Sequence, residues 1–161
     1  MALPVILVQL IVSQEYRSAE LRRLQDQLSA VRATIEEVVT SNLTAVEAMA
    51  AYIAVHPELS QNEFDAFASQ LLESSPGLRN LSGAPDFVVE YIHPLEGNEA
   101  FLRADYRDLG SQWDAVRAVR DEDRTILAGP IDLVQGGVGL VARSPVYEAD
   151  SGAFWGVVSA L

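Results

Sequence analysis

The sequence contains no cysteine and no lysine, and only two of its 161 residues are histidine. The absence of cysteine excludes disulfide bonds, thiolate nucleophiles and cysteine-ligated metals. The 11 basic residues, all arginine, stand against 23 Asp and Glu, which gives a formal net charge of −12. A chain with this negative charge repels nucleic-acid phosphates and anionic lipid headgroups. We therefore expect neither as a partner. A hydrophobic content of 49% predicts one globular domain with its own core.

Residues that commonly carry catalysis or bind metals are also scarce. His56 and His93 each stand directly before a proline, which is typical of the boundary of a helix or strand. The sequence has no His-x-x-x-His pair and no Gly-x-Ser-x-Gly elbow, which argues against a zinc centre and a serine hydrolase. The glycines of Gln135–Gly139 lack the spacing of phosphate-binding loops and predict a tight hairpin. We therefore expect no catalytic residue, no metal site and no cofactor.

The chain begins with a short hydrophobic run. Residues 2–12 are apolar apart from Gln9. As a helix they span roughly 16 Å, about half of the ~30 Å core of a bilayer. The basic segment and the small-residue cleavage site of a signal peptide are both lacking. We interpret residues 1–12 as the remnant of a transmembrane helix, and the alternative is a hydrophobic tail that docks on the domain.

Residues 13–56 form a second predicted segment, a long stalk helix. Neither proline nor glycine occurs between Ser13 and Val55, and hydrophobic residues recur at the first and fourth positions of a heptad. Beyond residue 38 the apolar stripe widens, which indicates packing against a globular body. We therefore predict a stalk that forms a parallel homodimer, followed by a portion that packs on its own domain. The heptad residues are Leu21, Leu24, Leu28, Val31, Ile35, Val38, Asn42, Ala45, Met49 and Tyr52, and an Asn at such a position can fix the register of a dimer.

The remaining sequence predicts an α+β domain. Ser60 and Glu63 have the spacing of a capping box, which opens a second helix that runs to about Glu73. We expect a strand over 87–93, a helical turn over 99–102, a helix over 111–124, and strands over 125–135, 138–147 and 154–161. Short strands with hairpin-sized joints predict an antiparallel sheet, with helices before and beside it.

Six motifs follow one another in a characteristic order in the second half of the chain. They are Pro94–Glu99 (PLEGNE), Asp105–Arg107 (DYR), Leu127–Pro130 (LAGP), Val134–Gly137 (VQGG), Arg143–Tyr147 (RSPVY) and Phe154–Ala160 (FWGVVSA). In this order they resemble the CHASE domain, the extracytoplasmic sensor module of membrane-bound histidine kinases and cyclases. The resemblance covers about residues 78–161. It implies a PAS-like antiparallel sheet carried on a long helix that follows a transmembrane segment.

The resemblance also implies a function. Residues 57–161 are then the sensor domain of a receptor in the cell inner membrane, lying on the periplasmic side and binding a small molecule. Such a domain has no catalytic activity, and a histidine kinase or diguanylate cyclase elsewhere in the protein supplies the output. The alternative is a protein-interaction or dimerisation module without a small-molecule ligand. Plant cytokinin receptors share the family, but they have threonine where this chain has Ala128 and Arg143, which argues against a cytokinin.

The ligand site implied by the resemblance lies between the sheet and the segment 96–107. Arg143 is a charged residue in an otherwise apolar strand, and a buried charge needs a partner. Two alternatives stay open. Either Arg143 faces the cavity, where its fork suits a carboxylate or similarly acidic ligand, or it forms a structural pair with Asp105 or Asp132. The predicted ligand-binding residues are Glu96, Asp105, Tyr106, Asp132, Val134 and Arg143.

The same segment has a second predicted role, which is to fasten the loop after the first long strand. Gly97 provides backbone freedom for the turn, and Asn98 is expected to cap a short helix. The sequence Asp105–Arg107 is expected to hold the other end of the loop. Fastening and ligand contact do not exclude each other.

Overall fold

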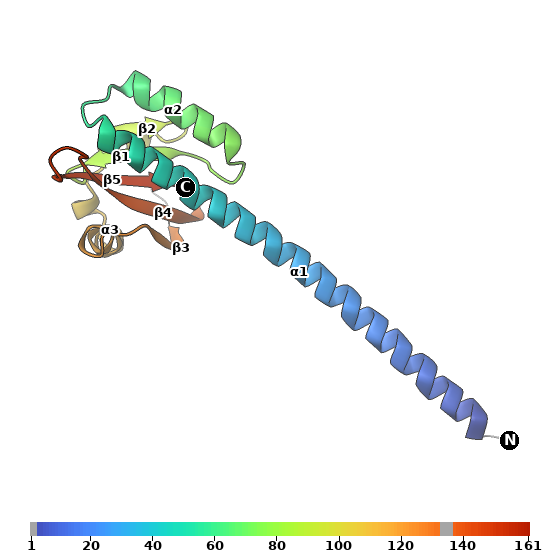
Figure 1. Cartoon of the computed structure of the whole chain (residues 1–161). Helices are drawn as coiled ribbons and strands as arrows, with labels where there is room; N and C mark the ends of the chain where they lie inside the picture. Colours follow the sequence, from blue (N-terminus) through green and yellow to red (C-terminus); the bar gives the residue numbers. More distant parts are fainter. Residues whose placement is uncertain (1–2, 133–136) are drawn as a thin grey trace. The chain divides into compact units, whose positions relative to one another are not determined.

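The computed structural model describes residues 3–132 and 137–161, with side chains from Glu20 onward except that of Ser111 (Figure 1). The chain divides into two compact units, Met1–Glu37 and Val38–Leu161. The helices are α1 (Leu3–Val55), α2 (Gln61–Ser74) and α3 (Ser111–Asp121), with 3-10 turns η1 (Glu99–Phe101) and η2 (Tyr106–Asp108). The strands are β1 (Leu81–Pro85), β2 (Tyr91–His93), β3 (Ile126–Asp132), β4 (Val138–Tyr147) and β5 (Phe154–Ala160).

The first unit is the N-terminal part of α1. The helix is unbroken from Leu3 to Val55, as the lack of proline and glycine predicts, and it ends just before Pro57. The heptad residues of the first unit from Leu21 on are exposed, and Leu28 keeps 69% of its surface accessible. This part of the helix therefore presents an apolar stripe that its own unit does not cover.

Among the residues whose side chains are described, the stretch Glu20–Val55 of α1 is long and apolar enough to cross a membrane, judged by length and composition only. Its most hydrophobic window has a mean hydropathy of 1.4. The core helix of a soluble domain passes the same test, and Val46, Met49 and Ile53 in this stretch belong to the core of the second unit. The finding is weak support for a membrane span.

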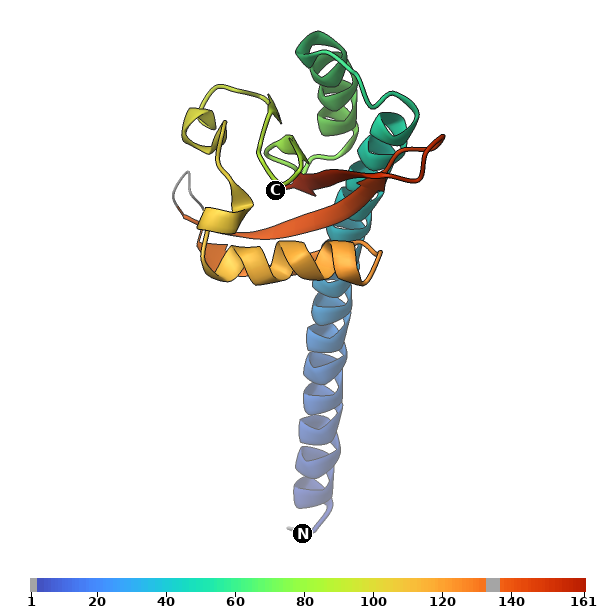
Figure 2. The ribbon, with the colours of Figure 1, turned by 90° about the vertical axis from the view of Figure 1, so that its left-hand side faces the viewer.

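The second unit is built on one five-stranded sheet with the order β2-β1-β5-β4-β3, in which all neighbours are antiparallel. Helices lie on both faces: the end of α1 and α2 on one, and α3 on the other (Figure 2). The prediction of an α+β fold with a long N-terminal helix and a PAS-like antiparallel sheet is confirmed.

The end of α1 packs on the sheet through the widened part of its stripe. Val46, Met49 and Ile53 have no exposed surface and contact residues such as Phe64 of α2 and Val158 of β5. Each fully buried aliphatic side chain contributes about 1.5–3 kcal/mol, so this contact is a large part of the core.

Asn42 also packs on its own domain. A Cβ at Gly77 would lie 3.3 Å from Asn42 Oδ1 and 2.5 Å from Val38 Cγ1, so the glycine permits a close approach to α1. Asn42 is thereby part of the internal packing. The expectation that Asn42 sets the register of a dimer stays a prediction.

The capping box of α2 is formed as predicted. The Ser60 hydroxyl accepts from the Glu63 N–H, and Glu63 Oε2 accepts from the Ser60 N–H over 2.8 Å. The second contact also lowers the pKa of Glu63, because the backbone N–H of Ser60 stabilises the charged carboxylate. The helix boundaries therefore follow from local sequence.

The first half of the sheet differs from the prediction. The strand expected over 87–93 is reduced to Tyr91–His93, because Asp86 and Phe87 have φ of +42° and +69° and form a turn. The strand before that turn, Leu81–Pro85, was not predicted. It lies in the sheet interior, between β2 and β5.

Candidate ligand site

A row of directly paired residues crosses the sheet on the face that α3 covers. Ile92 pairs with Ser82, Ser82 with Ser159, Ser159 with Arg143, and Arg143 with Ile126. Paired residues project to the same face, so three polar side chains stand side by side between two isoleucines. All three are buried, with 1% of Ser82, 4% of Ser159 and 2% of Arg143 exposed. A polar row so deep in a sheet needs partners.

Arg143 has fewer partners than a buried cation requires. Of its five N–H donors, one on Nη2 donates to Gln112 Oε1 over 2.8 Å, while Nε and Nη1 are buried and have no hydrogen-bond partner among the residues that the structure describes. Its Cζ lies 5.5 Å from the centroid of the Tyr106 ring, within range of a cation–π contact. No ion pair of the described residues includes Arg143. Buried guanidinium groups are normally paired with an anion, so this arrangement is unusual.

Tyr106 connects the covering loop to the row. Its side chain is fully buried, and its hydroxyl lies 2.8 Å from Ser159 Oγ. The loop is held at the same point by the backbone, because the Tyr106 N–H donates to Phe87 O over 3.0 Å. The ring thus lies between the loop and the guanidinium of Arg143.

Asp105 is engaged locally and does not reach Arg143. Its carboxylate caps η2 by accepting from the Arg107 N–H over 2.9 Å and pairs with Arg107 Nε at 2.8 Å. The hydrogen bond from the Arg107 side chain is the main reason why the pKa of Asp105 lies below its ordinary value. The pairing of Arg143 with Asp105 that the sequence left open is therefore absent from the structure.

The other predicted residues lie further from the buried row. Glu96 is exposed on the turn before η1, and Asp132 is exposed at the end of β3. Asp132 contributes its backbone carbonyl, which accepts from Gln112 Nε2 over 3.4 Å, and makes no ion pair with Arg143. Val134 lies outside the described residues. The structure thus brings together Arg143 and Tyr106 among the six.

Asn98 fastens the loop, though not as a helix cap. It occupies the position before η1 without a side-chain cap bond. Its amide instead donates to Pro94 O over 2.9 Å and accepts from Asn80 Nδ2 over 2.8 Å, and both asparagines are buried. Gly97 provides the expected positive φ of +79°. The fastening role is therefore realised through a buried amide pair.

Gln112 is the site residue that sequence reasoning missed. It lies in the first turn of α3, four and seven residues before the buried Val116 and Val119. A polar residue at this spacing falls on the apolar face of the helix, which points at the sheet. That position was a signal available in the sequence.

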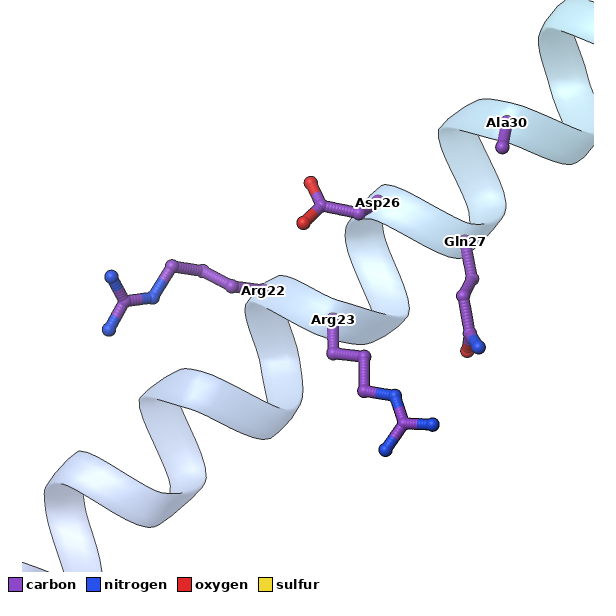
Figure 3. Close-up of a pocket in the computed structure, with 5 residues that line it drawn as sticks. All are labelled: Arg22, Arg23, Asp26, Gln27 and Ala30. Carbon is purple, nitrogen blue, oxygen red and sulfur yellow. The ribbon is translucent and has the colours of Figure 1, made fainter.

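Other hollows of the described residues do not involve Arg143 or the two serines of the row. One of about 180 Å³ lies between α2 and β2, and its lining includes Asp65, Glu90 and Arg103. Another of about 240 Å³ lies beside Asn42 and Leu140. The surface in Figure 3 is lined only by residues of α1, namely Arg22, Arg23, Asp26, Gln27 and Ala30, so it is the polar side of one helix.

Among the residues that the structure describes, no three His, Asp or Glu side chains converge into a group that could hold a metal ion.

Several solved structures resemble the chain, and three of them are as follows. An extracellular ligand-binding receptor from Desulfohalobium retbaense DSM5692 has a TM-score of 0.67 and 19% identity over 80% of this chain and 23% of its own. The ligand-binding domain of the Pseudomonas aeruginosa PAO1 amino-acid chemoreceptor PctC, solved in complex with GABA, has a TM-score of 0.60 and 18% identity. The match covers 80% of this chain and 56% of that domain. The sensory domain of the Campylobacter jejuni chemoreceptor Tlp3 (CcmL) has a TM-score of 0.63 and 16% identity, over 89% of this chain and 60% of that domain. At these identities the likeness shows the fold, and the chain spans between about a quarter and three fifths of the length of these structures.

None of the curated proteins compared is a significant match. The family model of the CHASE domain matches residues 33–161, which is most of the chain. That range includes the part of α1 that packs on the sheet, all five strands, and the buried row with Arg143. The predicted resemblance is therefore confirmed, and the chain belongs to the CHASE domain family of receptor sensor domains.

Proposed function

We propose that this chain is the periplasmic ligand-sensing domain of a receptor in the cell inner membrane. Its ligand is a small molecule that binds on the α3 side of the sheet, at Arg143. One observation carries the proposal: Arg143 is buried, and within the described part of the chain two of its nitrogen atoms have no hydrogen-bond partner. A fold rarely retains such a group for stability, because replacing buried ions by apolar residues is often neutral or stabilising. Retention for binding accounts for it.

The six predicted residues have different parts in this proposal. Arg143 and Tyr106 form the centre, and Gln112 joins them as a contact of the guanidinium. Asp105 and Glu96 belong to the loop that covers the centre, and their contribution is to hold that loop. Asp132 and Val134 stay proposed as residues of the rim. The three similar structures are sensor or ligand-binding domains by their titles, which supports a sensory role.

The output and the membrane anchorage are further parts of the proposal. Residues 1–12 belong to a transmembrane helix, residues 13–56 form the stalk, and a histidine kinase or diguanylate cyclase domain of the full protein receives the signal. The full gene sequence tests this part. A gene that encodes neither a flanking span nor a kinase or cyclase contradicts it.

A thermal-shift screen of metabolites on the 161-residue chain tests ligand binding. A compound at 100 times its dissociation constant adds about 2.7 kcal/mol of stability, which raises the melting temperature by roughly 5–11 °C. We expect this shift to disappear in Arg143→Met and to persist in the control Arg117→Met, whose side chain is exposed on α3. A shift of equal size in Arg143→Met removes Arg143 from the site, and a screen without any shift counts against a small-molecule sensor.

The exposed stripe of α1 favours a second function, dimerisation through the stalk. Leu21, Leu28 and Ile35 are 58–69% exposed, which is unusual for such large apolar residues on one helix face. Two copies that pack along this stripe in parallel would bury it. In the full receptor in membranes we expect Leu28→Cys to crosslink efficiently and Asp26→Cys, on the polar side shown in Figure 3, to crosslink poorly. The reverse ranking contradicts the parallel stalk.

A further inference from the structure

Gln112 occupies the place at Arg143 where an anion would bind most strongly. We propose that Arg143 receives the carboxylate of a small acid and that this carboxylate replaces Gln112 Oε1 as the partner of Nη2. The proposal rests on the sensor function proposed above. It adds the chemical class of the ligand and names the internal contact that the ligand breaks.

The geometry of a guanidinium group makes Gln112 a competitor of the ligand. A carboxylate binds a guanidinium by two parallel N–H···O bonds, and the two edges available are Nε with Nη2 and Nη1 with Nη2. Nη2 belongs to both edges and directs one of its two N–H groups to each, so Gln112 occupies one edge and competes with a carboxylate bound there. Each edge also holds one atom without a hydrogen-bond partner among the described residues. A carboxylate on either edge therefore engages a donor that lacks a partner now. It also contributes a charge, and charge-assisted bonds are about twice as strong as neutral ones.

Access to Arg143 requires the residues that cover it to shift. Nε and Nη1 are buried, and the Gln112 side chain contacts the same guanidinium, so the proposed ligand enters where Gln112 shifts. The side chain of Gln112 makes one hydrogen bond with Arg143 and a long one of 3.4 Å with Asp132 O, while Trp113 in the same turn packs on Phe87. The turn begins after Gly110, whose φ of +53° marks a sharp change of direction of the chain. In this proposal ligand binding is coupled to the position of the Gln112 side chain.

The surroundings of Arg143 favour a ligand with a single negative charge. The groups that contact Arg143 or lie next to it in the row are an amide, a phenol and a hydroxyl, on Gln112, Tyr106 and Ser159. None of these side chains carries a positive charge, so none could pair with a second carboxylate of the same ligand. A small monocarboxylate therefore matches the charge of the site.

The chain itself can provide the carboxylate that tests the proposal. In Gln112→Glu the new carboxylate replaces Oε1 beside Nη2, and we expect the melting temperature of the 161-residue chain to rise by roughly 4–8 °C at neutral pH. The same substitution in an Arg143→Met background is expected to lower it, because the carboxylate is then half-buried without a cation. Gln112→Met, which is similar in length and uncharged, is the control and is expected to give no rise. Arg143→Gln is a second neutral background if Arg143→Met fails to fold.

The outcomes separate this proposal from the sensor function. The proposal is overturned if Gln112→Glu gives no rise, or an equal rise without Arg143. It is also overturned if the ligands found by screening are uncharged and still bind Arg143→Met, although the sensor function then stands. A rise that depends on Arg143, together with a screen in which no acid binds, supports the anion site and contradicts the small-molecule sensor. Two results together support both the anion site and the sensor function. Acids found by screening bind while their primary amides do not, and the same acids no longer raise the melting temperature of Gln112→Glu.

Discussion

The hydroxyl of Tyr106 gives a sharp test of the buried row. Tyr106→Phe removes the group that lies 2.8 Å from Ser159 Oγ and keeps the ring that covers Arg143. Both residues are buried, so no water replaces the lost partner at Ser159. The expected result is a loss of stability without a change of fold.

The size of the loss follows from the burial of both partners. An intramolecular hydrogen bond contributes about 0.5–1.5 kcal/mol net, and a buried group left without its partner costs about 1–3 kcal/mol. We expect a loss of about 1.5 kcal/mol for Tyr106→Phe, which corresponds to a fall in melting temperature of roughly 3–6 °C. Tyr106→Phe with Ser159→Ala removes both partners and should regain about 1 kcal/mol of that loss.

Urea unfolding followed by circular dichroism measures these changes as midpoints at constant slope. Tyr147→Phe is the matched control, because its hydroxyl bonds Arg120 O over 3.2 Å at a site that is only partly buried. The control is expected to change the free energy of unfolding by about 0.5 kcal/mol or less. If Tyr106→Phe is no less stable than this control, or if Ser159→Ala adds to its loss instead of reducing it, the buried bond does not exist as described.

Two further predictions concern the core and acid stability. Gly156→Ala is expected to destabilise the domain by roughly 2–4 kcal/mol in the same urea assay, because its Cβ would lie 2.1 Å from the carbonyl oxygen of Ala84, a backbone atom that cannot swing aside. Unchanged stability contradicts the close approach of β1 and β5. The pKa values of Glu63 and Asp105 are lower in the folded than in the unfolded chain. Both carboxylates therefore stabilise the fold at pH values above their unfolded pKa of about 4. This stabilisation is lost as the pH falls below that value and through the folded pKa. Between pH 6 and about 3 the urea midpoint should fall less steeply with pH in the double variant Glu63→Gln with Asp105→Asn than in the native chain. If the dependence of the midpoint on pH is the same in both, these two carboxylates are not the cause of the acid sensitivity.

Local sequence signals predicted the later elements well and the first strand poorly. Strand β4 has the predicted bounds of Val138 and Tyr147, because an apolar run and flanking glycines specify it locally. Strand β1 has the sequence LSGAP, whose small residues and proline have little strand preference. It becomes a strand because β5 and β2 pair with it on both sides. No pattern within five residues carries that information.

The site shows the same division between local and long-range information. Arg143 was found because a charge in an apolar strand is visible in the sequence. Its partner was not found, because the choice among Asp105, Asp132 and Gln112 depends on tertiary packing. Asp105 pairs with Arg107, two residues away, since closing so short a loop costs little entropy. The more distant Arg143 therefore keeps a neutral partner.

The alternation of side chains along β4 places Arg143, the centre of the proposed ligand site, and the helix contact on opposite faces of one strand. Arg143 points to the face of α3, while its neighbour Ala142 belongs to the cluster that holds Val46 and Met49 of α1. The end of the same hairpin is bonded to the helix, because the Ala149 N–H donates to Ala54 O over 2.8 Å. A ligand that moves β4 at Arg143 acts on a strand that already contacts α1. Hydrogen exchange at the end of α1 in Gln112→Glu measures whether Arg143 and the helix are coupled. Altered protection there, against unchanged protection in α2, would connect the carboxylate to the helix that leads to the stalk.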